Sequence, residues 1–216
     1  MAHRALCLDP CLWGGPHLRF CRPIEAVPEP ASPPNSPRPP SLCTWIPEGA
    51  ELVVLMRAGP HPTSPPLATV VYIPREDTLY FARPEFALAP ACPAGLAFLC
   101  QFTVDAAGAP RLLAVDLMEG EGGTGTVEAP PPPAARYGRL QGAARHLQAP
   151  SCMVQWCGEA QALTDPFLAT LPHRVSGLLA LTADPCRPRL LRRQTRCPSP
   201  AGGSAASTPR TPPRPG

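Results

Sequence analysis

The sequence contains no lysine, although it has nineteen arginines, and it has a single asparagine, Asn35. Without lysine, the chain has no side-chain amine that can form a Schiff base or a lysyl-nucleotide intermediate. A phosphate-binding P-loop is excluded for the same reason, because its motif GxxxxGK[ST] requires a lysine. The abundance of Ala, Pro, Gly and Arg is typical of a GC-rich coding sequence, so composition is partly a matter of codon usage.

Long apolar runs are also missing. No run approaches the roughly 18–20 residues of a membrane span, and the N-terminus MAHRALCLDPCLWGGPHLRF lacks the sustained apolar stretch of a signal peptide. We therefore expect a soluble intracellular protein, cytoplasmic or nuclear, with no membrane contact. In such a compartment the ten cysteines are expected to be reduced thiols rather than a disulfide framework.

What is abundant is proline, with 35 residues among 216. Each proline removes a backbone donor and fixes φ, so long helices are disfavoured. Prolines concentrate in residues 1–41 and 185–216, which we predict to be disordered tails, with residues 22–41 as a polyproline linker. The tails offer PxxP segments to SH3-type modules, and Ser-Pro or Thr-Pro sites to kinases, although a plain spacer is the alternative. Those sites are Ser32, Ser36, Thr208 and Thr211.

The middle of the chain, residues 42–184, has the texture of a folded domain. Short apolar runs rich in Val, Leu and aromatic residues are bounded there by Pro, Gly or charge, which is typical of strands. These runs are ELVVLMR, ATVVYIP, DTLYFA, LAFLCQFTVD, RLLAVDLME, SCMVQWC and SGLLALTAD. The fourth and fifth predict a hairpin that turns at residues 105–110.

Two windows favour helices, residues 136–148 and residues 158–171, with Pro166 interrupting the second. Residues 120–133, GEGGTGTVEAPPPP, predict a flexible Gly/Pro insertion. The predicted fold is therefore a single α+β domain, with one twisted antiparallel sheet and two short helices, between disordered Pro-rich tails.

Charge is distributed unevenly. Residues 187–216 carry seven arginines and no acid, whereas residues 42–186 carry eight arginines and thirteen acids. The tail is suited to RNA, an anionic surface or an acidic partner, while the body has no excess of basic residues for tracking phosphates.

Motifs for catalysis or metal binding are weak. Cys7, Cys11 and Cys21, with His3 and His17, are zinc-ligand types at irregular spacing, so incidental cysteines are the favoured interpretation, and we predict no metal. GxSxG is absent, and His173 and Cys100 are predicted to be structural. The chain is therefore predicted not to be an enzyme and to use no cofactor.

Asp116 lies inside the predicted strand RLLAVDLME. Strand alternation places it on one face with Leu112, Ala114 and Met118, a half-buried setting in which an acid needs a partner. An arginine such as Arg136 or Arg139 can supply that partner. The alternative is a metal site formed by Asp116 with Glu119 or Glu121, but neither a histidine ligand nor a phosphate loop accompanies these acids.

Four segments follow one another as CTWIPEGAELVVLMRAG, LAFLCQFTVDAAGAPRLLAVDLMEGEG, ARYGRL and PHRVSGLLALT. In this order they resemble the snurportin-like trimethylguanosine-cap-binding domain, a distant relative of the mRNA capping guanylyltransferases and ATP-dependent ligases. In that superfamily a hairpin carries an acidic strand of the type LLxxDxLxxxG, an Arg-rich helix follows, and a later strand reads DGLLF. The resemblance spans roughly residues 42–184.

Two departures from the superfamily pattern select its non-catalytic branch. The enzymes attach a nucleotide to a motif lysine, which this chain lacks, and Ser176 stands where an aspartate would precede Gly177. The resemblance thus implies a non-enzymatic binding or adaptor module for capped RNA or a nucleotide-like ligand. Snurportin-type domains stack the cationic cap base on tryptophan.

The resemblance also implies candidate ligand contacts at Trp45, at Arg57 and on the face near Asp116. Trp45 falls where one stacking tryptophan of the family lies, while no tryptophan follows Trp156 in this chain to supply the second. The alternative for Trp45 is a core position at the start of a strand. The alternative for the whole chain is a protein-interaction scaffold that acts through its Pro-rich and Arg-rich tails.

Overall fold

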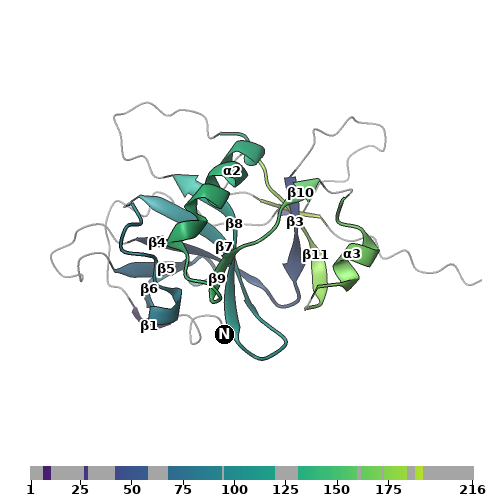
Figure 1. Ribbon diagram of the computed structural model, residues 1–216. Coiled ribbons are helices and arrows are strands. Elements are labelled where there is room, and N and C mark those ends of the chain that lie inside the picture. The colour runs from purple at the N-terminus through teal and green to yellow at the C-terminus, as the bar shows by residue number, and fades with distance from the viewer. Residues whose placement is uncertain are drawn as a thin grey trace, which may run out of the picture.

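The computed structural model describes residues 7–10, 27–28, 42–57, 68–93, 95–119, 131–159, 162–171, 173–183 and 188–191. The described strands form two sheets (Figure 1). The large sheet runs in the order β1 (Cys7–Pro10), β6 (Thr78–Ala82), β5 (Thr69–Ile73), β4 (Glu51–Arg57), β7 (Leu96–Val104), β8 (Pro110–Glu119) and β9 (Cys152–Val154). The small sheet runs in the order β10 (Gly158–Glu159), β3 (Leu42–Pro47), β11 (Val175–Ala180), β12 (Arg189–Leu191) and β2 (Val27–Pro28).

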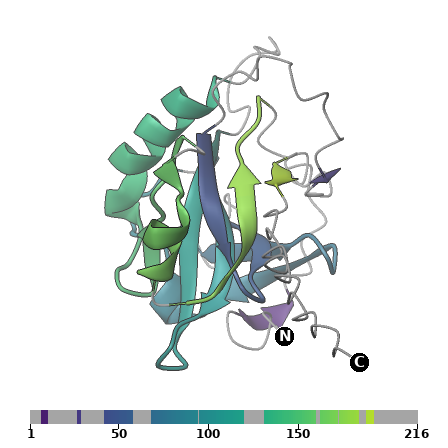
Figure 2. The same ribbon diagram turned by 90° about the vertical axis from the view of Figure 1, so that its right-hand side faces the viewer.

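The sheet-rich α+β class predicted from the sequence is seen in the structure, but the single sheet is wrong. The large sheet is apolar on both faces: Val53 and Leu55 pack into one cluster, and their neighbours Val54 and Met56 pack into another. An apolar face must be covered by another element. Helix α2 (Pro133–Ala143) covers one face, and β3 and β11 of the small sheet cover the other (Figure 2).

The small sheet has a second cover of its own. Helix α3 (Asp165–Ala169) packs on its outer face, where Cys43, Trp45 and Ala180 meet Leu163 and Leu168. The layers therefore follow one another as α2, large sheet, small sheet and α3. Two 3₁₀ turns, η2 (Pro84–Phe86) and η3 (Ala144–His146), complete the described elements.

The predicted hairpin is confirmed as β7 and β8, which pair antiparallel from Leu96↔Glu119 to Val104↔Pro110. Its turn is organised by Asp105, whose Oδ1 accepts hydrogen bonds from the backbone N–H of Ala107 and Ala109, both at 2.9 Å. Gly108 has a positive φ of 79°, a conformation that glycine adopts without strain. Arg111 then donates from Nε to Asp105 Oδ2 at 2.9 Å across the base of the turn.

Both predicted helices differ from the structure in extent. The first begins at Pro133, three residues before the predicted start, because a proline without an N–H fits the first turn of a helix. The second shrinks to α3, and Pro166 lies in its first turn rather than interrupting it. Pro131–Pro133, counted in the flexible insertion 120–133, are described and lead into α2.

Parts of the predicted disordered tails are strands. Within residues 1–41, β1 pairs with β6 and β2 pairs with β12. Within residues 185–216, β12 pairs with β11 from Leu178↔Leu191 to Ala180↔Arg189. Backbone pairing with a sheet edge is what orders a chain terminus. Ser32, Ser36, Thr208 and Thr211 lie outside the described residues.

Strand β8 contains a register shift that the sequence pattern does not reveal. Leu99 pairs with Asp116 and Cys100 with Ala114, so Val115 has no opposite partner and forms a bulge. Before the bulge, Leu112 and Ala114 face the α2 side of the sheet; after it, Met118 faces the small sheet. The prediction that Asp116 shares a face with Leu112 and Ala114 is therefore wrong, because the extra residue turns Asp116 toward the small sheet.

Candidate functional site

Trp45 lies on the outer face of the small sheet, and its side chain is only 8% exposed. Its indole Nε1–H donates to His173 Nε2 at 2.9 Å. Its ring meets Phe167 of α3 edge-on, with the ring centroids 5.7 Å apart at 64°. The indole is therefore a packed core group with a satisfied polar tip, and its faces are not open to a stacking base.

The Trp45 carbonyl is also fully engaged. The side-chain amides of Gln101 and Gln155 donate to it at 3.0 Å and 2.9 Å. Gln101 also donates to Gln155 Oε1 at 3.1 Å. Both glutamines are buried between the sheets, where β10 pairs only with the first two residues of β3. The two glutamine amides thus supply hydrogen bonds to the Trp45 carbonyl, which lies on a part of β3 that does not pair with β10.

A second tryptophan extends this arrangement to the surface. Trp156 is 43% exposed, and its ring lies 5.7 Å from that of Phe167, tilted by 50°. The ring also folds over the Cα of Gly158. Trp156, Phe167, Trp45 and His173 form a continuous series, called here the aromatic row, that runs from an exposed ring to a buried one.

A cavity of about 390 Å³ adjoins the inner end of the aromatic row. Helix α3 and the segment leading into β11 form its wall. The wall combines apolar side chains with one acid, one arginine and one imidazole. The lining residues are Asp165, Leu168, Ala169, Leu171, His173, Arg174 and Val175. This cavity is called the α3 pocket.

The hydrogen bond from Trp45 determines the tautomer of His173, a residue that lines the α3 pocket. Because Nε2 accepts a hydrogen bond from the indole, the proton of the neutral imidazole is on Nδ1. Burial lowers the pKa of His173, which favours this neutral form. The Arg174 carbonyl accepts from Glu48 N–H at 2.8 Å, which anchors the backbone beside the histidine. The pocket thus contains an arginine and a neutral imidazole on a fixed segment.

Arg57, the second candidate residue, lies at the far end of β4 and is 6% exposed. Its guanidinium donates from Nη1 to the carbonyl of Ala89, and its Nε is buried without an acceptor. Arg57 lies on the α2 face of the large sheet, as Leu55 does, whereas α3 lies beyond the small sheet. It therefore does not contribute to the aromatic row or the α3 pocket.

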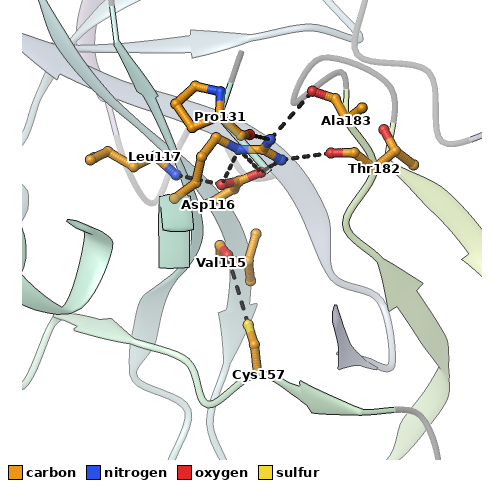
Figure 3. A network of polar contacts seen from close by, with 8 residues as sticks. Val115, Asp116, Leu117, Pro131, Cys157, Thr182 and Ala183 are labelled. Atoms are coloured by element: carbon orange, nitrogen blue, oxygen red, sulfur yellow. Dashed lines mark hydrogen bonds and ion pairs between the residues drawn. The ribbon is translucent and has the colours of Figure 1, made fainter. Parts of the chain in front are cut away.

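Asp116, the third candidate, is 1% exposed and is held by Arg136. Figure 3 shows Asp116 with Leu117, Pro131 and Thr182 around it. Arg136 Nη2 donates to Asp116 Oδ2 at 2.7 Å, and Nε donates to Oδ1 at 3.0 Å. The Leu117 N–H donates to the same carboxylate at 2.9 Å. The predicted arginine partner is confirmed, and it is Arg136. Burial raises the pKa of Asp116, an effect that outweighs the opposing influence of the Arg136 hydrogen bonds and charge.

The three candidate residues are thus kept apart: Trp45 faces α3, Asp116 is enclosed between the sheets, and Arg57 lies under the α2 face. The residues that line a cavity are instead His173 and Arg174, whereas Trp156 is exposed and contacts Phe167 of α3. Sequence reasoning predicted His173 to be a structural loop residue and gave Trp156 no role. The only sequence signal for Trp156 is its spacing two residues before Gly158, where a missing side chain leaves room for a ring.

Among the described residues, no group of three or more His, Cys, Asp or Glu side chains is placed to hold a metal ion. The residues weighed as zinc ligands, Cys7, Cys11, Cys21, His3 and His17, fall outside the described part except for the backbone of Cys7. Among the described residues, Cys43, Cys92, Cys100, Cys152 and Cys157 carry buried thiols that are not in disulfide bonds. Burial raises the pKa of Cys152 and of Cys157 to about 12, so both thiols stay protonated at neutral pH.

No helix in the described ranges is long and apolar enough to cross a membrane. The chain matches no protein-family model and no curated protein.

Proposed function

We propose that this chain is a non-enzymatic binding module whose ligand is nucleotide-like, with capped RNA as the specific candidate. The observation that carries the proposal is Trp156, an exposed indole that rests on Gly158 and on Phe167 of α3, the helix that also lines the α3 pocket. A flat ring stacks well on an indole that is already fixed, and a methylated cap base adds cation–π attraction because it is positively charged.

Helix α3 links the stacking surface to the pocket. Its Phe167 supports Trp156, and its Asp165 and Leu168 line the cavity. Arg174 supplies a positive charge for a phosphate, and His173 Nδ1–H supplies a neutral donor. An exposed indole that contacts α3 and an arginine that lines the pocket beside α3 suit a ligand that has a base at one end and a phosphate at the other.

Under this proposal the tryptophan that stacks on the ligand is Trp156, not Trp45. The resemblance to snurportin-like domains points to Trp45, but the indole of Trp45 is enclosed by Phe167 and hydrogen-bonded to His173. Under the proposal, Trp156 stacks on the ligand while Trp45 holds His173 at the pocket. Asp116 and Arg136 stabilise the fold and do not contact the ligand.

Titration of the full chain with a methylated cap analogue, and separately with unmethylated GTP, tests the proposal by tryptophan fluorescence and calorimetry. We expect tighter binding of the methylated analogue and quenching of Trp156. Trp156→Ala should abolish binding, whereas Met153→Ala, which truncates another exposed apolar side chain on β9, should leave it unchanged. If neither ligand gives a signal at millimolar concentration, or if Trp156→Ala binds as well as the wild type, the proposal is wrong.

A truncation separates this proposal from the scaffold alternative. Removal of residues 192–216 eliminates most of the Arg-rich tail but keeps β12, which pairs with β11. Under the present proposal, the truncated chain binds the cap analogue with unchanged affinity. If partner capture depends on the tail alone and the α3 face binds nothing, the scaffold alternative is favoured instead.

A further inference from the structure

The structure contains two buried arginines in contrasting environments. Arg136 and Arg57 are 3% and 6% exposed. The three guanidinium nitrogens of Arg136 all have acceptors, from the Asp116 carboxylate and from the carbonyls of Pro131, Thr182 and Ala183. Arg57 donates from Nη1 to the carbonyl of Ala89, while its buried Nε has no acceptor. Within the described ranges, no carboxylate forms an ion pair with Arg57.

A buried cation without a counter-charge is unfavourable, because desolvation of an ion costs several kcal/mol. Deprotonation offers no relief, since an arginine side chain stays charged in proteins. The titratable neighbour of Arg57 is Cys92. Burial raises the pKa of that thiol more than the charge of Arg57 lowers it, so Cys92 supplies no negative charge at neutral pH. Residues 58–67, AGPHPTSPPL, contain no acid in their sequence.

A second hydrogen-bond donor lies next to Arg57. Thr69 on β5 pairs directly with Arg57 on β4, so both side chains are on the same face of the sheet. Thr69 Oγ1 accepts from the Leu88 N–H at 2.8 Å, which leaves its own O–H to donate. The Ala89 N–H in turn donates to the His146 carbonyl at 2.9 Å, so the segment that covers the pair is tied to η3.

We propose that Arg57 and Thr69 bind an oxyanion, the phosphate or carboxylate group of a small ligand, at the end of β4. The Nε–H of Arg57 and the hydroxyl of Thr69 donate to the anion, and its charge compensates the buried guanidinium. This site lies on the α2 face of the large sheet, whereas the aromatic row lies beyond the small sheet. It does not depend on the function proposed for the α3 face.

Thermal unfolding of the full chain in a zwitterionic buffer of low chloride tests the site, with inorganic phosphate and acetate added in separate series. Phosphate at a hundred times its Kd should raise the Tm of the wild type by about 5 °C or more. Arg57→Met should lose this rise, because the apolar side chain of similar length has no charge to compensate. Arg75→Gln, at a side chain that is 82% exposed, should keep it.

Thr69 provides a second and milder variant. Thr69→Ser retains the hydroxyl and should retain the response, whereas Thr69→Val should reduce the affinity roughly tenfold, as expected for one lost hydrogen bond to a charged group. A response to phosphate alone assigns the site to phosphate ligands, and a response to acetate alone assigns it to carboxylates. If neither anion stabilises the wild type, or if Arg57→Met responds as strongly as the wild type, the site does not exist.

Discussion

Arg136 holds Asp116 through two of its nitrogens, with Nη2 at 2.7 Å and Nε at 3.0 Å from the carboxylate oxygens. The same guanidinium also donates to the carbonyls of Pro131 and Thr182, at 2.6 Å and 2.7 Å. One side chain therefore connects β8, the start of α2 and the end of β11. Both members of the ion pair are almost completely buried, at 4% and 1% exposure of their side chains.

Arg136→Met is expected to lower the free energy of unfolding by about 3–5 kcal/mol, because it leaves a buried carboxylate without a partner. Urea denaturation followed by circular dichroism measures the change. Arg139→Met, an exposed position in the same helix, should cost less than about 1 kcal/mol. In the double variant Arg136→Met with Asp116→Asn, part of the lost stability should return. Equal losses at positions 136 and 139 would contradict the role given to the ion pair.

Gly158→Ala is expected to expel the Trp156 ring. A Cβ at position 158 would lie 2.2 Å from Cη2 of the indole and 2.5 Å from Cζ2, far inside van der Waals contact. The tryptophan emission should therefore shift to the red, and the ligand response proposed for the α3 face should weaken.

The matched control for this substitution is Gly142→Ala in α2, where nothing lies within 4 Å of the added Cβ. That change should leave the emission unaltered and stabilise the helix by about 0.5–1 kcal/mol. An unchanged emission maximum in Gly158→Ala would show that Trp156 does not rest on Gly158.

His173 is expected to make the fold weaker in acid. Burial lowers its folded-state pKa below the ordinary value of 6.5, so the unfolded chain takes up the proton first. The associated stability is fully present above pH 6.5 and is lost as the pH falls through the lower folded-state pKa. Protonation also removes the Nε2 acceptor of the Trp45 indole.

Urea denaturation at a series of pH values, compared between the wild type and His173→Gln, isolates this contribution. The variant should show a smaller decline of stability between neutral pH and the folded-state pKa, and it should show no acid-induced change in Trp45 emission. Parallel pH profiles for the two proteins would contradict the prediction.

The buried thiols are expected to resist alkylation in the native state. The pKa of Cys152 and of Cys157 is raised to about 12, and both side chains are enclosed, so little thiolate is present or accessible. Iodoacetamide followed by peptide mass spectrometry should modify them only when urea is added. Arg136→Met should accelerate labelling of Cys157, whose Sγ contacts the Val115 carbonyl next to Asp116, more than labelling of Cys152 (Figure 3).

The hairpin and the partner of Asp116 were predictable from the sequence for physical reasons. Two apolar runs on either side of a turn rich in Gly and Ala define β7 and β8, and a buried carboxylate requires a cation within reach. The sequence does not decide between Arg136 and Arg139, because both lie in the helix that follows the hairpin. Only the packing of α2 decides it, placing Arg136 inward and Arg139 outward.

Other features depend on contacts that a one-dimensional pattern does not contain. The bulge at Val115 occurs within an uninterrupted apolar run, so alternation alone gives the wrong face for Asp116. The aromatic row depends on α3, a helix of five residues that is too short for a periodic signal. The second sheet follows from the need to cover both apolar faces of the first one, which strand counting along the chain does not show.

Strand β2 and strand β12 lie side by side and parallel, with Val27 next to Arg189 and Pro28 next to Leu190. Two segments from opposite ends of the sequence thus share one ladder at the edge of the small sheet. Detachment of β12 would leave β2 without its neighbour, so the two ends are expected to gain or lose protection from proteases together. A proteolytic cut that removes one of these strands would then also make the other strand more susceptible to proteases.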